Sequence, residues 1–150
     1  MSAIINLNFN KFVPLVRMKE NIILFDGECN LCDNTIRYII KNDKLKVFKF
    51  SSLQSDFAKN LLISNKIKDS GETVILFYEN SFFIESDAML IILKNLKGFN
   101  RFLCFILGLT PKFFRDFFYR IISKNRYKIF GNKTYCNHKE YNEYIERFFQ

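Results

Sequence analysis

Hydrophobic and polar positions along the chain change period several times, and each change marks an expected element. The run "NIILFD", residues 21–26, is short and apolar and ends at Asp-Gly, which predicts a buried strand followed by a turn. From Cys29 onward the period is helical, and this helix is expected to end near Asn42. Its apolar face consists of Cys32, Ile36, Ile39 and Ile40.

The middle of the chain predicts three more strands and two more helices. In order, we expect a strand at 45–50, a helix within 51–65, strands at 73–78 and 81–85, and a helix over 87–96. Glu79 and Asn80 form the hairpin turn between the last two strands. Ser86 is the expected N-cap of the last helix, which is apolar on almost every side and should be buried against a sheet.

The final third predicts helices only. Thr110 is an expected cap, followed by Pro111 at the first helical position. The apolar face of that helix consists of Phe113, Phe114, Phe117, Phe118, Ile121 and Ile122. A last helix is expected near 138–149, where Tyr141, Tyr144, Ile145 and Phe148 recur at helical spacing.

This order of elements is typical of a thioredoxin-like α/β domain. A strand, helix and strand predict a parallel crossover, and the later hairpin adds an antiparallel pair, which together give a mixed four-stranded sheet with flanking helices. We divide the chain into an N-terminal extension (1–20), a thioredoxin-like core (21–98) and a C-terminal helical extension (99–150) packed on the same domain.

Composition places the chain among globular proteins. Its 150 residues, 49% hydrophobic and 25% charged, suit one domain with one core. Residues 1–20 lack the basic start and clean apolar run of a secretory signal. The longest apolar run, 102–109, is far shorter than the roughly 20 residues that cross a bilayer. Four cysteines without a signal indicate a reducing compartment, so we expect a cytoplasmic location.

The net charge of +8 is concentrated in one region. Residues 94–139 hold eleven Lys and Arg residues and a single acid, Asp116. The favoured interpretation is a solvated basic face opposite a buried stripe of Phe side chains. The alternatives are contact with an anionic membrane surface or with an acidic protein partner. Nucleic acid is not expected, because no nucleic-acid-binding motif is present.

Cys29 and Cys32 stand three residues apart at the expected start of the first helix. Thiol–disulfide exchange needs a thiolate nucleophile and a second thiol close enough to resolve the mixed disulfide. Unpaired N–H groups at the helix N-terminus favour a thiolate at Cys29. Cys32 lies in line with the buried face, so its thiol is expected to be shielded. Two buried cysteines without function remain the simplest alternative.

Two acids precede the cysteines. Asp26, at the strand end, is placed to take the proton from Cys32 when that thiol attacks the mixed disulfide, or to cap the helix or turn, and the two roles are compatible. Glu28 adds negative charge beside Cys29 and opposes a thiolate there. Since no Lys, Arg or His lies between the cysteines, a strongly oxidising pair is not predicted.

Structural zinc is another interpretation of the cysteines. Cys29, Cys32, Cys136 and His138 would supply three thiolates and one imidazole, an acceptable ligand set. The C-x-H spacing and the long gap between the two pairs are unusual for such a site, and His138 reads more simply as an exposed residue at a helix start. Cys104 lies within "FLCFIL" and is expected in the core.

Three separated segments, "ILFDGECNLC", "FSSLQS" and "NRYKIFGNKTYC", resemble the DCC family of predicted thiol-disulfide oxidoreductases. The family is named for an Asp, Cys, Cys pattern, here Asp26, Cys29 and Cys32, and the resemblance covers about 22–136. It implies a thioredoxin-like fold and dithiol-disulfide activity, and it suggests that 51–55 and 125–136 belong to the site. Thioredoxins place a cis-proline before the third strand, where this chain has Thr73.

We therefore expect a thiol-disulfide oxidoreductase with Cys29 as nucleophile, Cys32 as resolving thiol and Asp26 as proton acceptor. Further candidate site residues are Gly27, Glu28, Asn30, Leu31, Ser52, Thr73, Arg126 and Cys136. No metal or organic cofactor is required, because the redox-active group is the disulfide of Cys29 and Cys32. The expected partners are a disulfide-containing protein or small thiol and an upstream reductant. A non-catalytic module, zinc-bound or docking through its basic face, is the alternative.

Overall fold

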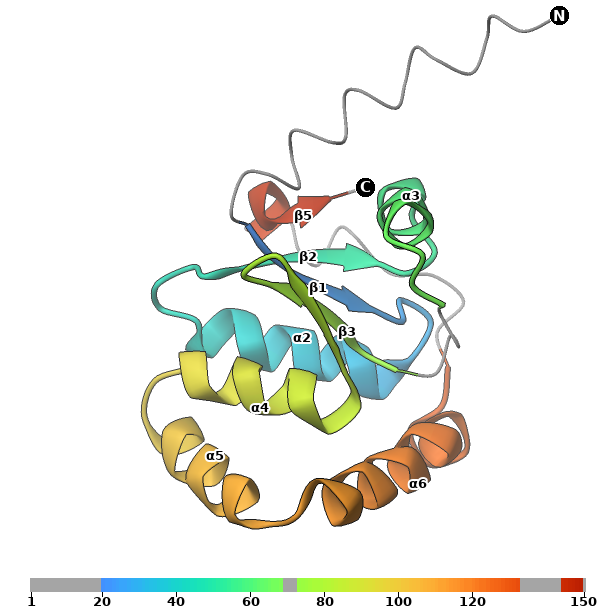
Figure 1. Cartoon of the computed structure of the whole chain (residues 1–150). Coiled ribbons are helices and arrows are strands. Elements are labelled where there is room, and N and C mark those ends of the chain that lie inside the picture. The colour runs from blue at the N-terminus through green and yellow to red at the C-terminus, as the bar shows by residue number, and fades with distance from the viewer. Residues whose placement is uncertain (1–19, 69–72, 133–143, 150) are drawn as a thin grey trace, which may run out of the picture.

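The computed structural model describes residues 20–68, 73–132 and 144–149, which form a five-stranded mixed sheet with helices on both faces (Figure 1). The strands are β1 (Asn21–Phe25), β2 (Phe48–Ser52), β3 (Ile75–Tyr78), β4 (Ser81–Ile84) and β5 (Phe148–Phe149). The helices are α2 (Asn30–Asn42), α3 (Asp56–Ser64), α4 (Glu85–Asn95), α5 (Phe99–Leu109) and α6 (Lys112–Phe130). The expected thioredoxin-like α/β class is confirmed.

The sheet has the order β4-β3-β1-β2-β5. Strand β1 runs parallel to β2 across the α2 crossover and antiparallel to β3, which pairs antiparallel with β4. These four strands are the expected ones. The turn between β3 and β4 has positive φ at both Glu79 (47°) and Asn80 (64°), as a two-residue hairpin requires.

The fifth strand is a difference from the sequence prediction. Phe148 and Phe149 extend the sheet parallel to β2, so the helix expected through 149 is wrong for this part of the chain. The two rings lie on opposite faces of the sheet, since Phe148 packs against Phe50 and Phe149 stacks on Phe57. Consecutive side chains on opposite faces are the property of a strand, and helical spacing alone does not reveal it.

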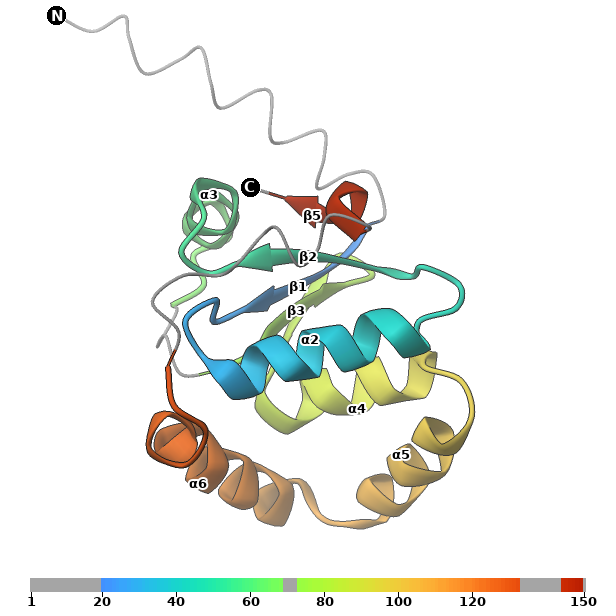
Figure 2. The ribbon, with the colours of Figure 1, turned by 180° about the vertical axis from the view of Figure 1, so that it is seen from behind.

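Each face of the sheet has its own apolar core. Ile23 and Phe25 of β1 point to the side covered by α2 and α4, whereas Ile22 and Leu24 point to the side covered by α3. Figure 2 shows these layers from behind, with α2 and α4 below the sheet and α3 above it. Strand β1 is therefore buried on both faces, which explains its continuous apolar sequence.

Two expected helix caps are absent. Helix α4 begins one residue before Ser86, and the Ser86 hydroxyl instead donates to the Asp116 carboxylate of α6. Helix α6 begins at Lys112, and the hydroxyl of Thr110 donates back to the Leu107 carbonyl at 2.6 Å. Ser55, by contrast, is the N-cap of α3, where its hydroxyl accepts from the Ala58 N–H at 3.1 Å.

Helices α5 and α6 form an outer layer against α4 (Figure 1). The side of α6 that faces the body is polar, because Asp116, Arg115 and Arg120 bond to Ser86, Asp87 and Glu85 respectively. The Phe stripe is turned outward, with Phe113 76% exposed and Phe117 53% exposed. The predicted buried Phe stripe is therefore wrong. Cys104, expected in the core, is only half-buried, with its thiol 3.5 Å from the Leu90 carbonyl.

Candidate functional site

The cysteine pair lies where β1 gives way to α2. Cys29 is the N-cap of α2, in extended conformation, and its Sγ accepts a hydrogen bond from the Cys32 N–H at 3.3 Å. Both residues are free thiols, and both are buried, Cys29 completely and Cys32 with 7% exposed. The helix start at Cys29 and the shielding of Cys32 are confirmed. The N–H at the positive end of α2 stabilises negative charge on the Cys29 sulfur.

The environment of Cys32 keeps its thiol protonated. Burial is the main cause that raises the pKa of Cys32, and a hydrogen bond with Cys29 adds to it. The positive charge of Arg126 acts in the opposite direction and lowers the pKa of this thiol. Both cysteines belong to the same buried apolar cluster, and the Cys29 sulfur in addition accepts the Cys32 N–H.

Asp26 is the centre of a hydrogen-bond network beside the cysteines. It is buried, and its Oδ1 accepts from the Glu28 N–H at 3.0 Å and from the Gln54 side-chain amide at 2.9 Å. Its Oδ2 accepts from the Arg126 guanidinium at 2.6 Å and from the Tyr127 hydroxyl. Four donors fill the acceptor capacity of one carboxylate. Asp26 also caps the local turn, since the Glu28 bond spans two residues.

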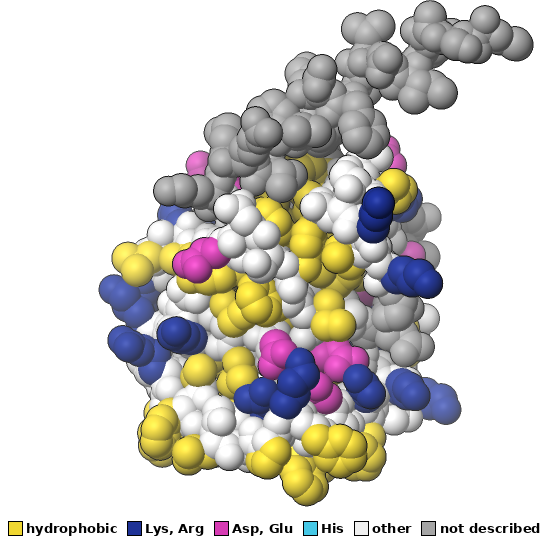
Figure 3. Space-filling model, in the orientation of Figure 1, with side chains coloured by type: hydrophobic (Ala, Val, Ile, Leu, Met, Phe, Trp, Pro, Cys, Tyr) yellow, Lys and Arg dark blue, Asp and Glu magenta, His cyan; other side chains and the backbone are white. Residues whose placement is uncertain are grey.

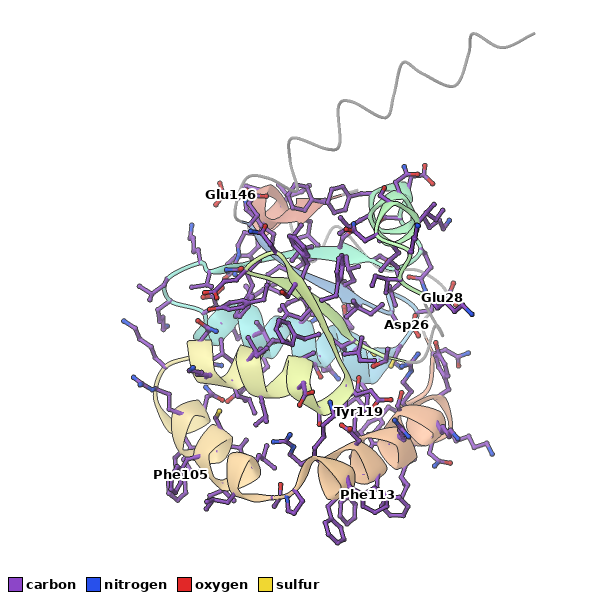
Figure 4. All side chains as sticks on the ribbon, viewed as in Figure 1. Asp26, Glu28, Phe105, Phe113, Tyr119 and Glu146 are labelled. Atoms are coloured by element: carbon purple, nitrogen blue, oxygen red, sulfur yellow. The ribbon has the colours of Figure 1, made fainter. Side chains whose placement is uncertain are left out.

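Helix α6 brings a positive charge to the site. Arg126 is buried and forms an ion pair with Asp26, whose side chain is equally buried. Figure 4 shows Asp26 where β1 meets the far end of α6. No Lys, Arg or His lies between the cysteines in the sequence. In the structure the positive charge near them comes from Arg126, which is a hundred positions from its partner Asp26. The resemblance had pointed to 125–136, and Arg126 is the residue through which this segment bonds to Asp26.

Gln54 and Tyr127 are site residues that the sequence did not single out. Gln54 bonds to Asp26 through its amide nitrogen, while its Oε1 accepts from the Gly27 N–H at 3.1 Å and from the Ser52 hydroxyl. Ser52 therefore reaches Asp26 only through Gln54. Gln54 and Tyr127 lie within the segments that carry the family resemblance, but no periodicity or motif distinguishes them from neighbouring polar residues.

The segment just after α6 covers Cys29. The Asn30 side-chain amide donates to the Phe130 carbonyl at 2.9 Å, and the Asn30 N–H donates to the Gly131 carbonyl at 3.5 Å. Asn132 forms an antiparallel bridge with Cys29 itself. Gly131 has φ of +74°, and a Cβ added there would lie 3.3 Å from the Asn30 amide nitrogen. The backbone conformation therefore favours glycine, and the Asn30 amide would have to shift slightly to admit a Cβ.

Thr73 joins α6 to the start of β3. Its hydroxyl lies 3.2 Å from the Tyr119 hydroxyl, which also accepts from the Val74 N–H at 2.9 Å. Burial is the main cause that raises the pKa of Tyr119. No cis peptide bond occurs within the described ranges 20–68, 73–132 and 144–149.

The remaining candidates are placed as follows. Gly27 is buried in the turn, and Leu31 packs against the apolar core on the side of the sheet that α2 and α4 cover. Glu28 is exposed, and Figure 4 shows it at the edge of the molecule. Cys136 and His138 lie outside the described residues. Within 20–68, 73–132 and 144–149, no group of three or more Cys, His, Asp or Glu side chains could hold a metal ion.

Comparison with known proteins agrees with this geometry. Residues 23–132 match the model of the DCC1-like thiol-disulfide oxidoreductase family. A chloroplastic DCC family protein of Arabidopsis thaliana is 36% identical over 119 residues, 79% of this chain and 69% of the relative. The uncharacterized protein YuxK of Bacillus subtilis is 33% identical over 121 residues, 80% of this chain and 88% of the relative. No solved structure matches. The chain therefore belongs to the DCC1-like thiol-disulfide oxidoreductase family.

Proposed function

We propose that this protein transfers two electrons between its Cys29–Cys32 dithiol and an external disulfide. The observation that carries the proposal is the cap of α2, where the Cys29 sulfur receives the Cys32 N–H and the second thiol stands in the same turn. A nucleophile at a helix N-terminus with a resolving thiol three residues later is the arrangement that disulfide exchange needs. The substrate is a protein disulfide or a small disulfide.

The reaction balances as two successive exchanges. The Cys29 thiolate attacks one sulfur of the substrate disulfide, forms a mixed disulfide and releases the first substrate thiolate. Cys32 then loses its proton and attacks Cys29 Sγ, which releases the second substrate thiolate and leaves the Cys29–Cys32 disulfide. An external dithiol returns the two electrons by the reverse exchanges. This cycle requires no metal or organic cofactor.

Arg126 and Asp26 support the second exchange. Cys32 is a weak acid because it is buried, so its deprotonation is the difficult part of resolution. The positive charge of Arg126 favours the thiolate, and the Asp26 carboxylate holds Arg126 in place. Asp26 also accepts the Cys32 proton in our proposal. To do so it must give up one of its four hydrogen bonds, and the Tyr127 hydroxyl is the donor that can rotate away.

Substrate access requires a local opening. Cys29 is fully buried, and the segment 130–132 is bonded to the start of α2. The Phe130 and Gly131 carbonyls accept only two hydrogen bonds from Asn30, one of them 3.5 Å long. Among the described residues, these two bonds and the bridge between Asn132 and Cys29 join this segment to the start of α2, so we propose that it opens locally without unfolding of the core.

A redox titration tests the proposal. The purified, metal-free protein is equilibrated in dithiol buffers of graded potential, free thiols are trapped by alkylation, and Cys29 and Cys32 are read by mass. We expect one two-electron transition that joins the two residues. Cys29→Ser should abolish turnover, and Cys32→Ser should trap a mixed disulfide. Thiols that stay free across the whole range, or full activity in Cys29→Ser, would contradict the proposal.

A further inference from the structure

Helices α5 and α6 present an apolar surface away from the body of the protein. We define the Phe face as six residues on these two helices: Phe102, Phe105, Leu109, Phe113, Phe117 and Phe118. Each of them is 53–76% exposed. At about 200 Å² for a large apolar side chain, they leave on the order of 700 Å² of apolar surface in contact with water. The largest apolar patch of a typical monomer is about 300–600 Å² and is often functional.

Helix α6 turns its polar side inward, which is the reverse of an ordinary surface helix. In α6, Asp116 bonds to Ser86, Arg115 lies 3.2 Å from Asp87, and Tyr119 accepts from Val74 at 2.9 Å. These contacts fix the rotation of α6 and leave its Phe side chains outside. Figure 4 shows Phe105 and Phe113 pointing away from the sheet at the outer edge, and Figure 3 shows apolar side chains gathered along this edge.

Cations accompany the Phe face, and acids do not. Lys124 and Lys128 follow Phe117 and Ile121 by seven residues each, so they continue the outward side of α6, and both are exposed. Arg101 is exposed on α5. No acidic partner of these three side chains occurs among the described residues. Residues 94–130 contain one acid, Asp116, and it faces α4.

We propose that α5 and α6 bind the surface of an anionic lipid bilayer. The Phe face would enter the boundary between headgroups and acyl chains, while Lys124 and Lys128 contact lipid phosphates. The chain's charge of +8 opposes pairing with a second copy of itself and favours an anionic surface. Contact is peripheral, because no helix in the described part of the chain is both long and apolar enough to cross a membrane.

Vesicle sedimentation with the full chain tests the proposal. The probes are phosphatidylcholine vesicles and vesicles in which part of that lipid is replaced by phosphatidylglycerol. We expect binding to the anionic vesicles that weakens as salt rises, since surface charges are screened. The double variant Phe117→Ser/Phe118→Ser should reduce the partition coefficient about tenfold or more, because the apolar area of both rings stays in water. Lys124→Glu/Lys128→Glu should reduce it by a similar factor on anionic vesicles only.

Ile63→Ser is the matched control, because Ile63 is an equally exposed apolar side chain, 71%, on α3. It should leave vesicle binding unchanged. Binding that survives in the Phe117→Ser/Phe118→Ser variant, or no binding to either vesicle type, would overturn the proposal. A wild-type dimer in sedimentation velocity that this Phe variant converts to monomer would overturn it in favour of self-association. None of these readouts depends on the redox chemistry of Cys29.

Discussion

Arg126 of α6 donates to Asp26 at the end of β1 across 2.6 Å, although a hundred positions separate them in the chain. Asp43 and Arg147 form a second buried ion pair, which ties the segment before β5 to the start of β2. Both pairs attach the C-terminal part of the chain to the sheet. Only the Asp26–Arg126 pair lies beside the cysteines. Comparing variants of the two pairs therefore distinguishes a structural role from a role in the chemistry.

Arg126→Met should destabilise the protein and also slow the chemistry. Removing one partner of a buried ion pair leaves an uncompensated charge, which costs about 3–5 kcal/mol. Arg147→Met should cost a similar amount, and urea unfolding measures both. Only Arg126→Met should slow the attack of Cys32 on the mixed disulfide, because Arg126 lowers the pKa of that thiol. Equal resolution rates in the two variants would show that the ion pair at Asp26 is structural alone.

Asp26→Asn should slow resolution about 100-fold if the carboxylate accepts the Cys32 proton. The asparagine amide keeps an acceptor oxygen for part of the network but has no basic group. With glutathione disulfide as a model substrate, acid quenching and mass analysis should show the mixed disulfide accumulating on Cys29. Glu28→Gln is the control, because Glu28 is an exposed carboxylate in the same turn. A resolution rate equal to that of wild type would leave Asp26 only its capping and anchoring bonds.

Gly131→Ala should expose Cys29. A Cβ at φ of +74° costs about 1–2 kcal/mol, and here it would also press on the Asn30 amide. If reagents reach Cys29 when the segment 130–132 opens locally, that cost raises the open population roughly 5–30-fold. Alkylation of the native protein, read by mass at Cys29, measures the change. Gly98→Ala carries the same backbone cost at φ of +75° with no neighbour within 4 Å. If Gly98→Ala accelerates alkylation of Cys29 equally, the route is global unfolding rather than this segment.

Local signals in the sequence were enough for the first four strands and for the cysteine pair at the start of α2. The apolar run before Asp26 and the helical spacing after Cys29 belong to neighbouring residues, and the structure has both elements there. The bonds of Asp26 to Arg126 and Gln54 join segments far apart in the chain, and no short-range pattern encodes them. The Arg126 contact depends on the packing of α6 against α2 and α4.

The rotation of α6 shows a second limit of sequence patterns. Helical spacing identifies an apolar side but does not say whether it faces the body. Here polar residues of α4 determine which side of α6 faces the body, because Ser86 bonds to Asp116 and Asp87 bonds to Arg115. Those contacts form only in the tertiary structure, so the helical spacing alone favoured a buried Phe stripe. In the structure the stripe is exposed.

The free energy of unfolding should fall at alkaline pH because of Cys32. Burial raises the pKa of this thiol above its ordinary value of 9.0. Above that pH the unfolded chain loses the Cys32 proton and the folded protein keeps it, so the unfolded state binds fewer protons. Stability is then lost by about 1.4 kcal/mol per pH unit until the folded pKa is reached. Below pH 9.0 this contribution is fully present.

Cys32→Ala isolates that effect from other groups that titrate in the same range. Tyr119 and Tyr127 also have raised pKa values and contribute a loss of the same sign in both proteins. Urea unfolding under reducing conditions, repeated from neutral pH upward, should give a steeper fall for wild type than for Cys32→Ala. Parallel curves would mean that Cys32 ionises as easily in the folded protein as in the unfolded chain, and the second exchange would then need no help from Arg126 or Asp26.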